Sequence, residues 1–400
     1  MMRRELPFPK HNDYELCNYL KECWEQGLFD EYSNEHFIIK AIENRLTTFV
    51  GFNQMLENEP NLYGIVLSKG IIDNTSFNAN FCLNLSNSLS CLASVFGKDK
   101  IEKFITDQLS AGKGQYNEDT FFEALSEISI LFFYARRAKW EQAIYEPPVN
   151  INGSVKNPEA KFVGNLCLGG SDSIRFSVNI EVKCPKFPSI NSEKRLAIPT
   201  IMLSQRGREL VPEFCKSYDI QYLSPRLLKL KDFLNSASEK FSIPQEGEYN
   251  LLYINWSYCD FPSNSFLEAW SLLTNDINGI LTHPDIAQKI GVSNDAFQKI
   301  TAVIVYTEAL EGLMFSDFRN VWQQNGKGPR FRMWILNNAL REAEISGNSN
   351  KLFIITGMKP TEALTQMVML DYKSKTDSDL AEAAMIGAEL VKLIGQNADS

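Results

Sequence analysis

The chain has 400 residues, of which 44% are hydrophobic and 22% charged, and its formal net charge is −9. This composition is typical of a globular protein with room for two or three domains, and it excludes a fibrous or largely disordered chain. The net acidity argues against a protein that coats nucleic acid non-specifically, so any contact with nucleic acid must come from local basic patches.

Other bulk features point to a cytoplasmic protein. No run of about 18 apolar residues predicts a membrane span, and no apolar stretch follows the basic start as in a signal peptide. The eight cysteines lack a close metal-type spacing, and Cys82, Cys91 and Cys167 lie in apolar runs. We therefore expect free, buried thiols in a reducing compartment rather than disulfides or a zinc site, and the three histidines argue against a histidine-rich metal centre.

Residues 1–115 are predicted to form a helical N-terminal domain. Apolar residues recur at spacings of three and four, the pattern of amphipathic helices, and the glycines of 111–114 suggest a linker. No catalytic constellation is evident in this region, so an interaction, recognition or regulatory role is expected for it. The helical patterns cover residues 15–20, 37–42, 86–96 and 101–109.

From residue 117 the pattern changes to that of an α/β domain, predicted to span residues 116–345. Asn117 or Asp119 can cap a helix over 120–138 that contains Glu127. Three strands and two turns follow, and then a helix capped by Ser224 and further strands. The expected strands are 143–145, 158–168, 174–183, 249–256 and 300–306; the turns are 151–154 and 169–172; and the helical stretches are 225–241 and 266–281.

Residues 346–400 are expected to form a C-terminal extension. Residues 351–355 suggest a strand, and residues 378–394 suggest an Ala- and Leu-rich helix. This helix could pack on the body of the protein or on a second chain.

The tripeptide Glu181-Val182-Lys183 ends the alternating strand 174–183. Residues two apart on a strand point to the same face, so Glu181 and Lys183 should project side by side. A carboxylate can hold a divalent ion, and a neighbouring lysine can orient or activate an attacking water. This pair therefore suits metal-assisted phosphodiester cleavage.

The order of elements over residues 117–310 resembles the PD-(D/E)-x-K nuclease superfamily. The resemblance implies a restriction-endonuclease-like core, in which helices flank a central mixed sheet. It also implies that Glu127, Glu159 and Glu181 hold Mg²⁺ (or Mn²⁺) and that Lys183 acts at the attacking water.

The chain departs from the family pattern at one position and offers alternatives at others. The family usually has aspartate after the proline, whereas this chain has Glu159, whose longer side chain must be re-aimed. Asp172 is a substitute ligand, and Asp371 with Lys373 forms a rival acid-x-lysine pair. The simplest alternative is that Glu181 and Lys183 are a solvated strand end.

Two further acids lie near the motif. Glu123, one turn before Glu127, is a weaker candidate for the helical acid, and Glu146 is expected to be a surface charge at a strand end.

Basic residues could contact a phosphate backbone at three places. Arg136 and Arg137 end the Glu127 helix, where they either complement the helix dipole or bind phosphate. Arg206 and Arg208 follow the motif strand, and residues 327–332 combine basic and aromatic side chains. For Arg206 and Arg208, and for residues 327–332, the alternative is an ordinary surface loop.

The sequence therefore predicts a Mg²⁺-dependent nuclease that acts on nucleic acid; DNA is the expected substrate, and RNA is the alternative. A role in bacterial restriction or anti-phage defence follows from family analogy alone. The main alternative is a catalytically inactive nuclease-fold protein that serves as a binding or assembly subunit; a scaffold built on the N-terminal helices is a third. A homo-oligomer or a partner protein could form through the N-terminal domain or the C-terminal helix.

Overall fold

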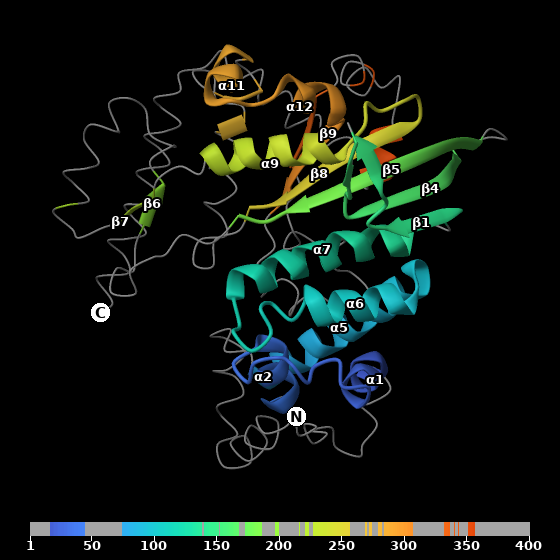
Figure 1. Cartoon of the computed structure of the whole chain (residues 1–400), viewed down its shortest axis with the longest axis vertical. Helices are drawn as coiled ribbons and strands as arrows, with labels where there is room; N and C mark the ends of the chain where they lie inside the picture. The colour runs from blue at the N-terminus through green and yellow to red at the C-terminus, as the bar shows by residue number, and fades with distance from the viewer. Residues whose placement is uncertain are drawn as a thin grey trace, which may run out of the picture. The chain divides into compact units, whose positions relative to one another are not determined.

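The protein is described by a computed structural model in which helices flank a mixed central sheet, an α/β architecture (Figure 1). The chain divides into two compact units. The first comprises Met1–Pro185, Pro244–Asn255 and Glu308–Arg330, and the second comprises Lys186–Ile243, Trp256–Thr307 and Phe331–Ser400. The residues that the structure describes are 17–44, 74–137, 140–151, 153–167, 173–185, 197–199, 216, 221–223, 227–256, 269, 272–273, 279–281, 284–306, 332–336, 340, 343 and 351–356.

The sheet strands of the first unit follow the order β1-β4-β5-β8. The pairs β1/β4 and β4/β5 are antiparallel, whereas β5/β8 is parallel, so the sheet is mixed. The four strands are β1 (Gln142–Tyr145), β4 (Ala160–Cys167), β5 (Ser173–Lys183) and β8 (Glu248–Asn255).

A short hairpin interrupts the path from β1 to β4. Strands β2 (Val149–Ile151) and β3 (Ser154–Lys156) pair antiparallel. Gly153 has a φ of 79° between them, a left-handed conformation that glycine adopts without strain. The predicted turn at 151–154 is therefore confirmed, and the hairpin lies in the connection from β1 to β4.

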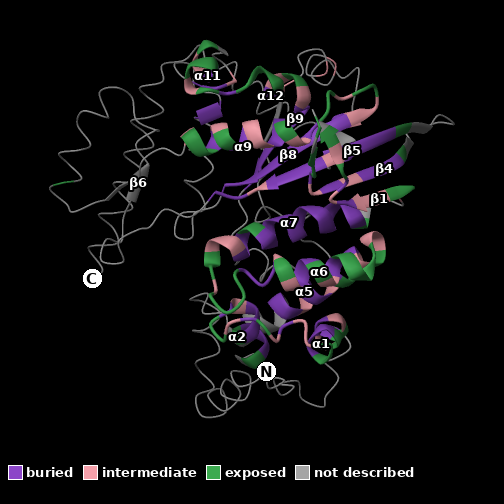
Figure 2. Cartoon of the chain, in the orientation of Figure 1, coloured by how far each residue is buried: buried purple, intermediate pink, exposed green. Residues whose placement is uncertain are grey.

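Helix α7 lies at the centre of the first unit. Helix α7 is buried on all sides from residue 124 to residue 135 (Figure 2), because the sheet lies along one face and α5 packs on another. The sequence pattern indicated one broad apolar face, but the buried Ser126 and Ser129 complete the helix circumference by donating to the carbonyl oxygens of Phe122 and Leu125. The helices are α1 (Asn18–Glu25), α2 (Phe37–Asn44), α5 (Asn74–Phe96), α6 (Lys98–Asp107) and α7 (Glu118–Arg137).

The N-terminal helices thus share one compact unit with the sheet. The predicted helical character of residues 1–115 is confirmed for the described residues 17–44 and 74–115. Whether residues 1–115, 116–345 and 346–400 fold as separate domains stays a prediction.

The second unit contains two strand pairs and a group of helices. Asn235 ties α9 to the start of α12, because its side-chain amide donates to the Gly291 carbonyl (2.9 Å) and its oxygen accepts from the Ser293 amide (2.8 Å). Strands β6 (Ala197–Pro199) and β7 (Gln221–Leu223) pair parallel, and β9 (Ala302–Tyr306) and β10 (Arg332–Ile335) pair antiparallel. The helices are α9 (Leu227–Lys240), α11 (Pro284–Ile290), α12 (Asn294–Lys299) and α15 (Lys351–Thr356).

One predicted element is wrong. Residues 351–355 were expected to be a strand and instead form helix α15. Leu352 and Ile355 are both buried and lie three residues apart, which places them on one helical face, and Thr356 Oγ1 donates to the Leu352 carbonyl (2.8 Å). The predicted helix at 378–394 lies outside the described residues, as does most of 266–281.

None of the described helices is long and apolar enough to cross a bilayer.

The turn between α6 and α7 offers a test of how α7 is held. Gly112 has a φ of 93°, and a Cβ atom there would lie 2.4 Å from the Gln115 carbonyl oxygen. We expect Gly112→Ala to lower the free energy of unfolding by about 2 kcal/mol or more, measured by chemical denaturation. Gly114→Ala is the matched control, because nothing lies within 4 Å of its Cβ position, and it should change stability by less than about 0.5 kcal/mol. Equal effects of the two substitutions would contradict this account of the turn.

Candidate functional site

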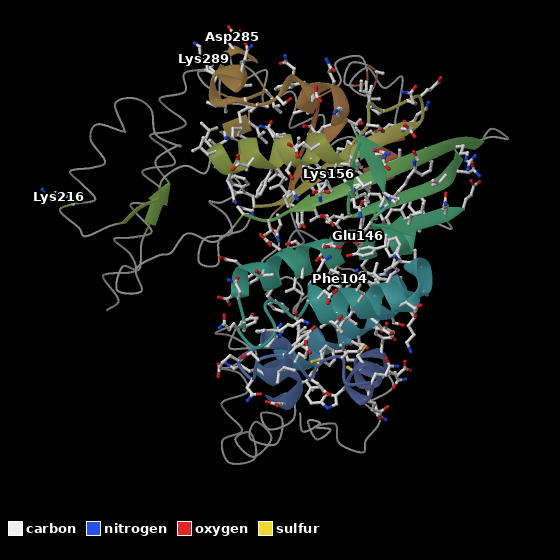
Figure 3. The ribbon with its side chains drawn as sticks, in the orientation of Figure 1. Phe104, Glu146, Lys156, Lys216, Asp285 and Lys289 are labelled. Atoms are coloured by element: carbon white, nitrogen blue, oxygen red, sulfur yellow. The ribbon has the colours of Figure 1, made fainter. Side chains whose placement is uncertain are left out.

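Three glutamates lie side by side at one end of strands β1, β4 and β5. Tyr145 pairs with Ala160, and Ala160 pairs with Ile180. The ladder continues one residue further, because the Glu146 amide donates to the Glu159 carbonyl (2.9 Å) and the Glu159 amide donates to the Ile180 carbonyl (2.9 Å). These bonds bring the backbones of Glu146 and Glu159, each one residue outside its strand, beside the end of β5 that carries Glu181; Figure 3 labels Glu146 at the end of β1.

Strand β5 separates its side chains onto two faces. Val178 pairs with Phe162, whose ring stacks on Tyr134 of α7, so Val178, Ile180 and Val182 face α7. Glu181 and Lys183 alternate with these residues and therefore point to the other face. Lys183 Nζ lies 2.6 Å from Glu181 Oε1, and Glu181 is fully buried. The predicted neighbouring pair is thus present, as an ion pair between a buried carboxylate and a half-buried lysine.

Glu127 reaches the same strand ends from α7. It lies seven residues before Tyr134, two helical turns away and on the same face. Only 6% of Glu127 is exposed, and the Tyr145 hydroxyl donates to its Oε1 (2.9 Å). Burial raises the pKa of the Glu127 carboxyl well above its ordinary value near 4.5, and the negative charge of Glu159 raises it further. The Tyr145 hydrogen bond lowers this pKa, whereas Glu146 and Glu181 add smaller upward contributions.

Two residues that the sequence did not suggest connect these acids. Tyr145, the last residue of β1, is buried beneath the rings of Phe96 and Phe104, whose centroids lie 5.8 and 6.3 Å away. Gln108, directly after α6, donates from Nε2 to the Tyr145 hydroxyl (3.2 Å) and to Glu146 Oε1 (3.3 Å). Burial and the Glu127 charge raise the pKa of Tyr145, so its hydroxyl stays protonated and available as a donor.

The four acids and the lysine of this group come from separated parts of the chain. The structure brings together the predicted residues Glu127, Glu159, Glu181 and Lys183 at one end of the sheet. Glu146, expected to be only a surface charge, is half-buried and hydrogen-bonded to Gln108. A signal for Tyr145 was present in the sequence, since a tyrosine at the end of a strand beside acids is a common carboxylate donor. No local signal pointed to Gln108.

The predicted basic contacts are described only in part. Arg136 is exposed, and its guanidinium lies 5.1 Å from the centre of the Phe132 ring. The side chain of Arg137 lies outside the described part of the chain, as do Arg206, Arg208 and the alternatives Asp172, Asp371 and Lys373. A phosphate-binding role for these residues stays a prediction.

The donor set suits a hard divalent cation in chemistry and charge. Glu127, Glu146, Glu159 and Glu181 supply oxygen ligands of the kind that Mg²⁺ prefers, and Lys183 offsets the charge of Glu181. The four carboxylates are not closely grouped, however. Among the described residues, no three His, Cys, Asp or Glu side chains lie close enough together to hold a metal ion. The pleat explains this, because Glu181 points away from α7 while Glu127 approaches from the α7 side.

Comparison with known proteins adds no relative: no family model, curated protein or solved structure matches the chain.

The raised pKa of Glu127 predicts an unusual pH dependence of stability. The folded protein holds the Glu127 proton more tightly than the unfolded chain does, so stability falls as pH rises above about 4.5 and through the raised pKa. A glutamine at position 127 cannot ionise, so the Glu127→Gln protein does not lose this stability as pH rises. In thermal unfolding without metal, we expect Glu127→Gln to raise Tm by several degrees near pH 8 and to change it little near pH 4.5.

Glu123→Gln is the matched control, since Glu123 is an exposed glutamate one turn earlier on α7. It should change Tm little at either pH. A Glu127→Gln protein that is less stable than wild type near pH 8 would show that the ionised carboxylate is stabilising instead.

Proposed function

We propose that the protein is a metal-dependent nuclease that hydrolyses phosphodiester bonds. The observation that carries this proposal is the gathering of Glu127, Glu159, Glu181 and Lys183 at one end of a mixed sheet. The elements around them also occur in the order of a restriction-endonuclease-like core, which we propose for residues 116–345.

Glu159 and Glu181, with Glu127, would hold Mg²⁺ or Mn²⁺. Such an ion, when bound, would supply Lewis-acid stabilisation of the developing phosphate charge and would acidify a bound water. The position of Glu127 supports this assignment, because burial raises its pKa, the charge of Glu159 raises it further, and a bound cation would counter both effects.

Lys183 would act at the attacking water. Its ammonium group has three donors and lies 2.6 Å from Glu181 Oε1. Donors of this group can orient a water beside the scissile phosphate. Because Lys183 is only 21% exposed, its stem is held by the strand and its packing, and little conformational freedom is lost in this role.

Nucleic acid is the proposed substrate, with DNA before RNA. The net charge of −9 requires the phosphate contacts to be local, and the exposed Arg136 is one candidate. Binding should therefore weaken steeply as salt rises. A cytoplasmic role in restriction or anti-phage defence rests on analogy of fold.

One observation favours a second candidate, a nuclease-fold subunit that binds without cleaving. The Lys183–Glu181 ion pair already neutralises the central acid, and the described carboxylates do not form a closed metal cage. In this alternative Lys183 is a permanent internal counter-ion, and the protein would bind nucleic acid or a partner with no need for metal.

Substitution of Lys183 distinguishes the two candidates. We expect wild type to cleave DNA or RNA with Mg²⁺ or Mn²⁺ and not with chelator, and Lys183→Ala to lose roughly 100-fold or more of that rate, because the water is no longer oriented. Cleavage is followed on labelled single- and double-stranded substrates of both kinds. Lys161→Ala is the matched control, because Lys161 is also a strand lysine paired with a glutamate, Glu248 (3.7 Å). The Lys161→Ala protein should cleave like wild type.

The outcomes distinguish the two candidate functions and test the assignment of the site. Wild type that binds nucleic acid but cleaves none of the substrates with either metal supports the binding subunit. Cleavage that persists in Lys183→Ala shows that the chemistry lies elsewhere in the chain.

A further inference from the structure

Two short helices of the second unit, α11 and α12, are joined by a tight, hydrogen-bonded turn. Helix α11 is followed by Gly291, whose φ of 87° is the left-handed conformation that commonly ends a helix. The Gly291 amide donates to the Gln288 carbonyl (3.0 Å), and the Val292 amide donates to the Ala287 carbonyl (2.8 Å), which is the Schellman pattern. Only residues 291–293 therefore separate α11 from α12.

The same turn starts α12 and attaches it to α9. Ser293 caps α12, because its hydroxyl oxygen accepts from the Asp295 amide (3.2 Å). Asn235 of α9 holds both sides of the turn, since it donates to the Gly291 carbonyl and accepts from the Ser293 amide. The direction in which α12 leaves the turn is therefore fixed against a third helix.

Helix α12 buries one face and exposes the other. Ala296 and Ile300 are each 1% exposed and lie four residues apart, so they form the inner face. Asn294 and Gln298 are also four residues apart, and both are exposed (Figure 2). Two neutral amide side chains thus share the outer face of a helix whose backbone is held in place.

The charge around the two helices differs from that of the whole chain. Helices α9, α11 and α12 together carry five lysines and four acids, whereas the chain has a net charge of −9. Lys289 is exposed on α11, where Figure 3 labels it, and Asp295 is paired with Lys299 (Nζ to Oδ2, 2.7 Å). Lys231 lies beside the turn, because a Cβ atom on Gly291 would be 3.8 Å from its Cδ. A polyanion can therefore approach this surface.

We propose that α11 and α12 form a helix-turn-helix element that binds double-stranded DNA. In this motif a turn of three or four residues, which often contains glycine, joins two helices, and the second helix lies in the major groove. Asparagine and glutamine amides match the N6 and N7 edge of adenine, so Asn294 and Gln298 are the residues that read bases. Lys289 contacts the phosphate backbone.

This inference goes beyond the proposed nuclease activity. Helices α11 and α12 belong to the second compact unit, and duplex binding by α12 needs neither a metal ion nor the acids of the first unit. It gives the chain a contact that can select a DNA sequence, which contacts to phosphate cannot do.

The test measures DNA binding by the full chain in the presence of a chelator, so that neither metal nor cleavage contributes. Wild type is used to enrich duplexes from a library of randomised sequence. Fluorescence anisotropy then gives the affinity for the enriched duplex and for an unselected duplex of equal length. We expect the double variant Asn294→Ala, Gln298→Ala to weaken binding to the enriched duplex by about tenfold or more, and binding to the unselected duplex by less than about threefold.

Lysine and charge variants test the orientation of the element. Lys289→Ala should weaken binding to both duplexes alike and lower the slope of log affinity against log salt by about one. Lys100→Ala is its matched control, because Lys100 is an exposed lysine of α6 in the first unit, and it should bind like wild type. Gln298→Glu keeps the size and helix propensity of the side chain but adds a negative charge, so it should weaken binding to both duplexes.

The outcomes separate this inference from the proposed function. If wild type enriches no sequence, or if the double variant binds the enriched duplex as tightly as wild type does, the helix pair is structural and the inference is overturned, although the nuclease proposal stands. Tighter binding of single-stranded DNA or of RNA than of the enriched duplex would also overturn it. A chain that cleaves nothing with Mg²⁺ or Mn²⁺ can still give the expected binding result, so failure of the nuclease proposal is recognised separately.

Discussion

The hydrogen-bond register of β1, β4 and β5 is the constraint on which the candidate site depends. It brings Glu146, directly after β1, and Glu159, directly before β4, beside the end of β5 that carries Glu181. Because side chains alternate along a strand, a slip of one residue in β5 would turn Glu181 and Lys183 toward α7 and turn Val182 to the opposite face. The apolar residues that face α7 oppose such a slip, so the packing of the core also holds the polar pair in position.

The second determinant is the burial of α7. A helix enclosed by the sheet and α5 cannot leave a mid-helix carboxylate in water, and Glu127 is therefore desolvated close to Glu159. Tyr145 and Gln108 partly compensate for this cost with oriented donors. The N-terminal helices thus affect the site in two ways: they enclose α7, and they supply Gln108. This coupling gives a physical reason why the helical region and the sheet share one compact unit.

Local patterns in the sequence predicted strands β1, β4, β5, β8 and β9 and the polar pair. They did not predict the short strands β2, β3, β6, β7 and β10 or the connections between distant residues. The alternation over 174–183 was sufficient to place Glu181 beside Lys183, and the capping asparagine Asn117 was sufficient to place α7. Gln108 was missed because its partner Tyr145 lies 37 positions away, and periodicity carries no information on such contacts. Residues 351–355 were assigned wrongly because a short apolar run with β-branched residues is compatible with both a strand and a helix.

The parallel pairing of β5 with β8 has a consequence for biosynthesis. Asn179 and Asn250, which face each other across this pair, are 71 positions apart in the chain. While the ribosome is still producing the intervening segment, the strand that carries Glu181 has an open edge on that side, where another extended chain could add. The acidic centre is fixed only after Glu248–Asn255 has emerged and docked. A nascent or truncated chain that stops before this segment would therefore leave this edge of β5 unpaired and would be prone to aggregation.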